Sequence, residues 1–162
     1  MAKNPDPMLE LTTSRGVTRT LDDWSTMFQL CLVVLPARLE AAAWIPVAQQ
    51  IFATFGDSDC RCAFVVTGGA EVAGRVLGQA AHDDVTFIDP DQALVTSLGL
   101  ERLPAFVHLR QDTTVAAAAE GWNPAEWQSV AREIARAMAW TYPEITGPNN
   151  PPRTEGWPLA IA

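Results

Sequence analysis

Cysteine and histidine are the residue types with the most chemical capacity in this chain, and five are present: Cys31, Cys60, Cys62, His82 and His108. Cys60 and Cys62 are separated by one residue, and two thiols so close could form a small strained disulfide and exchange it. The structural alternative makes Cys60 a loop residue and Cys62 a small core residue, since free cysteine is commonly buried. Cys31 lies inside an apolar run and is predicted to belong to the core.

Metal chemistry is not predicted from these residues. An odd count of three cysteines is not a disulfide framework. The two histidines lie far apart and no Cys-x-x-Cys pair is present, so neither a zinc site nor any other cofactor is expected. His108 alternates with apolar neighbours on a predicted strand, which is typical of a surface or hydrogen-bonded core histidine rather than a catalyst.

Composition indicates one domain with a substantial core. The chain has 162 residues, of which 48% are apolar and 19% charged. A net charge of −8 disfavours nucleic acid and anionic membranes as partners. The longest apolar run near the N-terminus, 30–35, is far shorter than the roughly 20 residues of a membrane span, and no secretory signal pattern is visible. A cytoplasmic protein without membrane insertion is therefore expected.

Strands and helices are predicted to alternate along the chain. The apolar patterns place strands at 28–35, 60–66, 85–89, 105–109 and 114–119, and helices at 38–55, 70–81, 90–99 and from Pro124 to about residue 140. Pro46 is expected to kink its helix. This order predicts an α/β fold with a mixed central sheet of four to five strands flanked by helices. Residues 1–19 are predicted to form an arm or edge strand, 20–141 the domain, and 142–162 a proline-rich irregular tail.

The segments LERLPAFVHL and GWNPAEWQSVAREIARAM, joined by a hairpin, resemble the thioredoxin-like superfamily over about residues 20–140. FIDPDQALVTSLGLERLPAFVHLRQD looks like the second half of its redoxin-type members. LGLERLPAFVHL is more loosely similar to the hydrogenase-expression thioredoxin-like proteins. The resemblance implies a thioredoxin-like fold with a cis peptide bond between Leu103 and Pro104. A cis bond costs only about 0.5–1 kcal/mol before proline.

The resemblance also implies where a redox motif should lie, and the motif is missing. Redox-active members of the family open the first long helix with W-C-x-x-C. With the sequences aligned on Pro46, the tryptophan falls on Ala37 and the two cysteines on Arg38 and Ala41. We therefore expect a non-catalytic protein, not an enzyme: an interaction, chaperone-like or assembly module with a protein partner, and potentially a homodimer.

A candidate groove follows from the same resemblance. The backbone beside the cis-proline of the family pairs with extended peptides, so Pro104, Leu103, Arg102, Arg38 and Trp44 are candidate lining residues. The alternative is that Trp44 packs its helix and the arginines are solvated. Two other functions stay open: a thiol–disulfide oxidoreductase using the C-x-C thiols, and a peptide or small-molecule binding domain at the cis-proline cleft.

The tail segment GWPLAIA, which carries a tryptophan at position 157, is open to three interpretations. It could fold back across the domain, dock on a partner, or dock on a second copy of the chain. Aromatic residues supply large, rigid apolar area to each of these arrangements.

Overall fold

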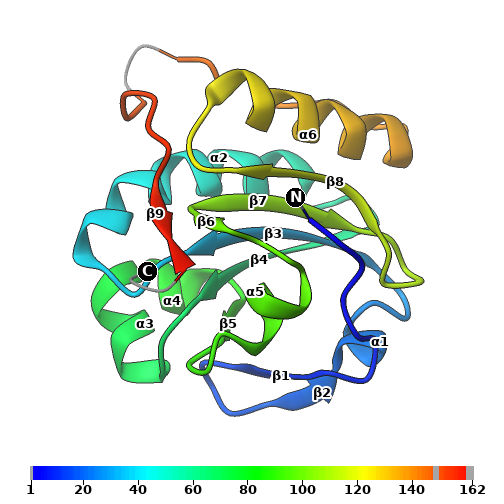
Figure 1. The fold of residues 1–162 in the computed structure, drawn as a ribbon. Coiled ribbons are helices and arrows are strands. Elements are labelled where there is room, and N and C mark those ends of the chain that lie inside the picture. The colour runs from blue at the N-terminus through cyan, green and yellow to red at the C-terminus, as the bar shows by residue number, and fades with distance from the viewer. Residues whose placement is uncertain (1, 148–149, 160–162) are drawn as a thin grey trace.

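A seven-stranded sheet forms the centre of the molecule in a computed structural model that describes residues 2–147 and 150–159 (Figure 1). The strand order is β2-β1-β5-β4-β3-β7-β8. The strands of this sheet are β1 (Glu10–Thr13), β2 (Thr18–Thr20), β3 (Gln29–Leu35), β4 (Cys60–Val66), β5 (Thr86–Ile88), β7 (Ala105–Leu109) and β8 (Val115–Glu120). The helices are α1 (Leu21–Trp24), η1 (Leu39–Trp44, 3₁₀), α2 (Ile45–Phe55), α3 (Ala70–Leu77), α4 (Ala80–Asp83), α5 (Ala93–Ser97) and α6 (Pro124–Met138).

The predicted α/β class and the mixed sheet with flanking helices are confirmed, but the strand count is wrong. β3 pairs in parallel with β4 and antiparallel with β7, and β4 pairs in parallel with β5. With β8, these make the five strands that the apolar patterns predict. The extra two, β1 and β2, form an antiparallel pair that continues the sheet beyond β5. They lie almost wholly within residues 1–19, for which the sequence predicted an arm or an edge strand. These short, partly exposed segments carry too little hydrophobic pattern to predict a pair of strands.

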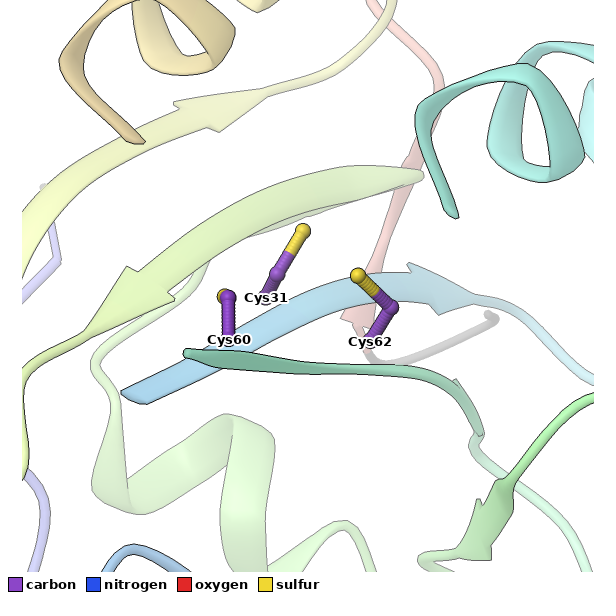
Figure 2. Close-up of side chains that lie close together, drawn as sticks. All are labelled: Cys31, Cys60 and Cys62. Carbon is purple, nitrogen blue, oxygen red and sulfur yellow. The ribbon is translucent and has the colours of Figure 1, made fainter. Parts of the chain in front are cut away.

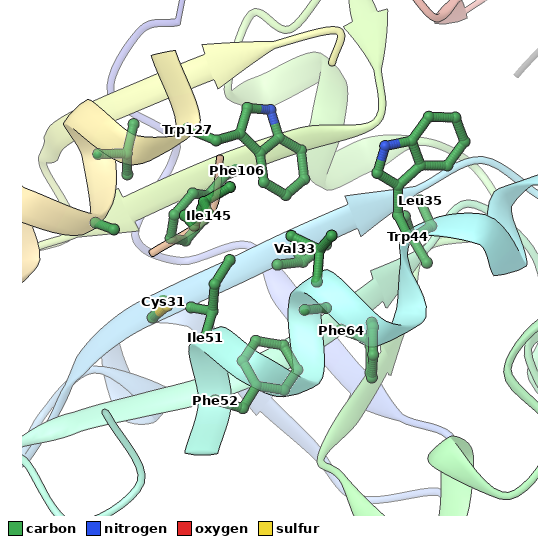
Figure 3. Close-up of a cluster of buried hydrophobic side chains, with 14 of the residues drawn as sticks. Cys31, Val33, Leu35, Trp44, Ile51, Phe52, Phe64, Phe106, Trp127 and Ile145 are labelled. Carbon is green, nitrogen blue, oxygen red and sulfur yellow. The ribbon is translucent and has the colours of Figure 1, made fainter. Parts of the chain in front are cut away.

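Two hydrophobic layers cover the faces of the sheet. β3 is buried along most of its length, with alternate side chains entering opposite layers, as expected for a central strand. One layer holds the side chains of Cys31, Val33 and Leu35 against α2, α3 and α6 (Figure 3). The other layer lies against α1 and α5. Among the described residues, no helix is both long and apolar enough to cross a membrane.

The predicted helix 38–55 is divided into two elements. A 3₁₀ segment precedes α2, and Pro46 lies in the first turn of α2. Proline is tolerated there because a first-turn amide has no partner inside the helix, so the predicted kink is wrong. The predicted helix 70–81 is likewise divided, since Gly78 adopts a positive φ of 57° and ends α3. The start of α6 agrees with prediction, with the Asn123 side chain accepting a hydrogen bond from the amide of Ala125.

The tail folds back across the domain, one of the three interpretations left open by the sequence. β9 (Trp157–Pro158) pairs antiparallel with β6 (Arg102–Leu103), and residues 160–162 lie outside the described part. The peptide bond that follows β6, Leu103–Pro104, is cis, as predicted. Gly156 permits the close approach, because a Cβ atom there would lie 2.0 Å from the carbonyl oxygen of Leu103. The C-terminal strand therefore covers the edge beside the cis-proline (Figure 1).

Candidate functional site

Three thiols meet on one face of the sheet, close to the first residues of β3 and β4. Cys31 and Cys62 are paired residues of these neighbouring parallel strands, and Cys60 lies two residues before Cys62. Because side chains alternate along a strand, all three point to the same face (Figure 2). Their sulfur atoms all lie within 4.8 Å of one another. We call Cys31, Cys60 and Cys62 the thiol cluster.

The members of the thiol cluster differ in their access to solvent. Cys31 is fully buried and Cys60 is 4% exposed, whereas Cys62 is only partly buried. An open cavity of about 430 Å³ lies beside the cluster and is lined by Cys60, Cys62, Phe28, Phe52, Gly56, Ser58, Arg61 and residues 83–85. A small molecule or an extended segment can therefore reach Cys62 first, while Cys31 stays behind it.

The three thiols also differ in their pKa values. Hydrogen bonds from the thiols of Cys31 and Cys60 lower the pKa of Cys62 to about 5, against the opposing effect of burial. Burial, with smaller contributions from the two neighbouring thiols, raises the pKa of Cys31 well above its usual value. A hydrogen bond with Cys31 lowers the pKa of Cys60, but its hydrogen bond to Cys62 and its burial outweigh this and raise it. Of the three thiols, Cys62 is thus the one that ionises most readily.

A buried histidine occupies the other side of Cys31. His108 of β7 is the antiparallel partner of Cys31 and is 1% exposed. Its Nε2 lies 2.5 Å from Oε1 of Gln29. An amide oxygen only accepts, so Nε2 carries the hydrogen and Nδ1 keeps a lone pair, which has no hydrogen-bond partner among the described residues. Burial, assisted by the Arg110 charge, lowers the pKa of His108 to about 4, so the ring is neutral at pH 7.

Strand geometry distinguishes the two possible disulfides of Cys62. Neighbouring strands lie about 4.7–4.9 Å apart, so the Cα atoms of Cys31 and Cys62 fall in the range of about 4.4–6.8 Å that disulfides span. Residues two apart on an extended strand are separated by about 6.6 Å, near the upper end of this range. The structure therefore favours a Cys31–Cys62 pair over the Cys60–Cys62 pair named from the sequence.

The residues predicted to line a groove beside Pro104 do lie together, and the tail covers them. Leu103 pairs with Trp157 and Arg102 with Pro158. The guanidinium of Arg38 lies 5.0 Å from the centre of the Trp157 ring, and the Trp44 and Trp157 rings meet edge to face at 5.7 Å. Binding of a partner or ligand at these residues stays a prediction, and it requires displacement of β9.

The resemblance implies two cysteines where the first long helix begins, but the two residues at these positions are Arg38 and Ala41. Arg38 is the residue before η1, and Ala41 is buried within η1. The thiol cluster lies toward the opposite end of β3, since Cys31 is four residues before Leu35 on that strand. Four residues of strand span about 13 Å. Any thiol chemistry of this chain therefore operates away from the cis-proline.

Sequence reasoning assigned Cys31 to the core and missed its place in the thiol cluster. The sequence does contain the two apolar runs that form the adjacent parallel strands β3 and β4, and these were the available indication that Cys31 could lie near Cys62. Aligning Cys31 with Cys62 requires the register between these strands, which no local pattern supplies.

No family model matches the sequence, and no curated protein matches it significantly. The fold, in contrast, is similar to many solved structures. A protein described as a thiol:disulfide interchange protein DsbE from Chlorobium tepidum has a TM-score of 0.69 at 17% identity, covering 85% of this chain and 98% of its own. A secreted disulfide oxidoreductase of Mycobacterium tuberculosis has a TM-score of 0.60 at 15% identity, covering 80% and 96%. Peroxiredoxin Q of Xanthomonas campestris has a TM-score of 0.61 at 14% identity, covering 81% and 89%.

These findings confirm the predicted thioredoxin-like fold and correct the predicted function. The expectation of a non-catalytic interaction, chaperone-like or assembly module is contradicted, because the similar structures are disulfide oxidoreductases and a peroxiredoxin. The prediction relied on the missing W-C-x-x-C motif. It did not consider that thiols distant in sequence could meet elsewhere on the same sheet, as the thiol cluster does.

Proposed function

We propose that this thioredoxin-like protein carries out thiol–disulfide exchange, with Cys62 as the attacking thiolate and Cys31 as the second thiol of the pair. The observation that carries the proposal is the thiol cluster, in which a partly exposed low-pKa cysteine lies beside a buried thiol. Only the thiolate attacks a disulfide, and the neighbouring thiols lower the pKa of Cys62 alone among the three. The fold shared with disulfide oxidoreductases supports the same class of reaction.

The exchange proceeds in two steps. The thiolate of Cys62 attacks one sulfur of a substrate disulfide, so that a Cys62–substrate bond forms, the substrate disulfide breaks, and the released thiolate takes a proton from solvent. Cys31 then loses its proton and attacks the Cys62 sulfur, which forms the Cys31–Cys62 disulfide and releases the second substrate thiol. The two cysteines supply two electrons to the substrate; the reverse sequence oxidises a dithiol.

The surroundings of Cys31 suit the second step. Its high pKa keeps it protonated and unreactive until Cys62 has been converted to a mixed disulfide, which also removes the thiolate that accepts its hydrogen bond. His108, the strand partner of Cys31, is a neutral buried base with an unpartnered nitrogen. His108 therefore places a neutral ring on the strand next to Cys31.

The proposal is tested by single-turnover reduction of 5,5′-dithiobis(2-nitrobenzoic acid) with the fully reduced protein. The native chain should release two chromophoric thiols per molecule quickly, and mass spectrometry should map a Cys31–Cys62 disulfide. Cys31→Ser should stop after one equivalent, with the probe attached to Cys62. Cys62→Ser should lose the fast phase.

Cys60→Ser is the matched control, because Cys60 forms no covalent bond in the exchange and the serine hydroxyl can replace its thiol as the hydrogen-bond donor to Cys62. It should keep two fast equivalents and the Cys31–Cys62 disulfide. The proposal fails if Cys62→Ser reacts as quickly as the native protein, or if the disulfide maps to another pair. Thermal unfolding of each variant shows whether a lost phase reflects loss of the fold instead.

A further inference from the structure

We propose that the thiol cluster also binds one thiophilic d¹⁰ cation, Cu⁺, through the sulfur atoms of Cys31, Cys60 and Cys62. This inference does not depend on thiol–disulfide exchange, because it requires three sulfur ligands in the reduced cluster and no reaction between them. Three sulfurs within 4.8 Å of one another are close to the arrangement that a metal ion requires. With a metal–sulfur distance of about 2.3 Å, three sulfurs around one ion lie about 3.8–4.0 Å apart. Small rotations of the cysteine side chains would bring the sulfur–sulfur distances from within 4.8 Å to this spacing.

The number and type of ligands favour Cu⁺ over Zn²⁺. Soft thiolates select Cu⁺ and Zn²⁺ among the biological cations. A structural zinc site is almost always tetrahedral with four protein ligands. In the described part of the chain, no histidine, aspartate or glutamate completes the group of three sulfurs. Three sulfur ligands suffice for a trigonal Cu⁺ ion. The sequence-based expectation of no metal rested on histidine and Cys-x-x-Cys patterns, which a site built across two strands does not need.

The surroundings support a bound cation in two ways. The cavity that reaches Cys60 and Cys62 provides an entry path. Cys31 lies among buried apolar residues of the same layer, such as Phe52 and Ile51, which give the inner side of the cluster an apolar environment (Figure 3).

Binding is a ligand-exchange reaction that transfers no electrons. Three copper–sulfur bonds form, the bonds between copper and its carrier chelator break, and copper remains Cu⁺. The protons of Cys31 and Cys60 go to solvent. A Cys31–Cys62 disulfide removes two of the three ligands, so the reduced cluster binds the cation and the oxidised cluster does not.

The experiment is an anaerobic competition between the reduced protein and the coloured Cu⁺–bicinchoninate complex. The native chain should remove one equivalent of Cu⁺, and X-ray absorption should count three sulfur neighbours. Cys60→Ser should bind at least tenfold more weakly, because it leaves only two sulfur ligands for the ion. Ser58→Ala is the matched control, since Ser58 lines the cavity but offers no sulfur; it should bind like the native protein.

The two proposals fail separately. If the native protein takes up less than one equivalent, shows two sulfur neighbours, or binds as tightly after Cys60→Ser, the copper site is overturned while exchange at Cys62 stands. If copper binds with three sulfurs but Cys62→Ser keeps the fast exchange phase, the proposed function is overturned and the copper site stands. Should Cys60→Ser fail to fold, the sulfur count on the native protein still decides.

Discussion

The low pKa of Cys62 makes a quantitative prediction about how its reactivity depends on pH. At pH 5, a thiol with a pKa of about 5 is about half ionised, whereas one at the ordinary value of 9.0 is ionised to about one part in 10,000. The difference in thiolate is about 5,000-fold. Intrinsic nucleophilicity falls as the pKa falls, with a Brønsted slope of about 0.4–0.5, so a thiolate four units less basic reacts about 40- to 100-fold more slowly.

The two effects together determine the pH at which the experiment is informative. At pH 7, Cys62 has only about 100-fold more thiolate than an ordinary thiol, and its weaker nucleophilicity cancels that advantage. At pH 5, it should react about 50- to 125-fold faster than an ordinary thiol. The assay is the initial rate with a small aromatic disulfide between pH 4 and 10, compared with a free cysteine peptide, with Cys62→Ser as the background.

The pH at which the plot of rate against pH has its inflection is the decisive quantity. Steric shielding of Cys62 would slow the reaction at every pH but would not change the pH of the inflection. We expect an inflection near pH 5 for the native protein. Cys31→Ala should shift it upward, since it removes the hydrogen-bond donor that lowers the Cys62 pKa most. An inflection near pH 9, or a rate at pH 5 that matches the Cys62→Ser background, would refute the hydrogen-bonded thiolate.

Three further predictions concern stability. The pKa of His108 is about 4 in the folded protein and 6.5 in the unfolded chain, so the unfolded chain binds a proton first as the pH falls. Urea titrations should therefore show that the free energy of unfolding decreases by about 3 kcal/mol between pH 6.5 and pH 4. The decrease should be smaller in His108→Leu, which lacks the titrating ring. Trp157→Ala removes an edge-to-face ring pair and a cation–π contact worth about 1–2.5 kcal/mol together, and faster hydrogen exchange confined to β6 and β9 should report it, whereas exposed Trp140→Ala should leave these amides protected. Asn123→Ala removes the N-cap of α6 and should lower the free energy of unfolding by about 1 kcal/mol, measured by chemical denaturation; an unchanged midpoint would contradict the cap.

Much of the fold could be predicted from local patterns. β4 and β7 have the residue limits that their apolar runs predict, and Asn123 with Pro124 specifies the start of α6. The cis bond at Pro104 was implied by resemblance and is present. The main local error is the single helix predicted over 38–55, which the structure divides between Trp44 and Ile45. An apolar pattern at helical spacing continues through a 3₁₀ turn without interruption.

The candidate site was predicted only in part, and the reason is physical. The sequence alone determined which thiols exist and that Cys60 and Cys62 are separated by one residue, and the resemblance implied that Arg38 and Ala41 stand where redox-active relatives carry cysteines. Only the tertiary structure decided that Cys31 pairs with Cys62 and that their shared face is buried. Strand register and burial depend on contacts between segments about 30 residues apart, and no pattern within either segment contains that information. Because register and burial set the surroundings of each thiol, they also decide which sulfur ionises most readily.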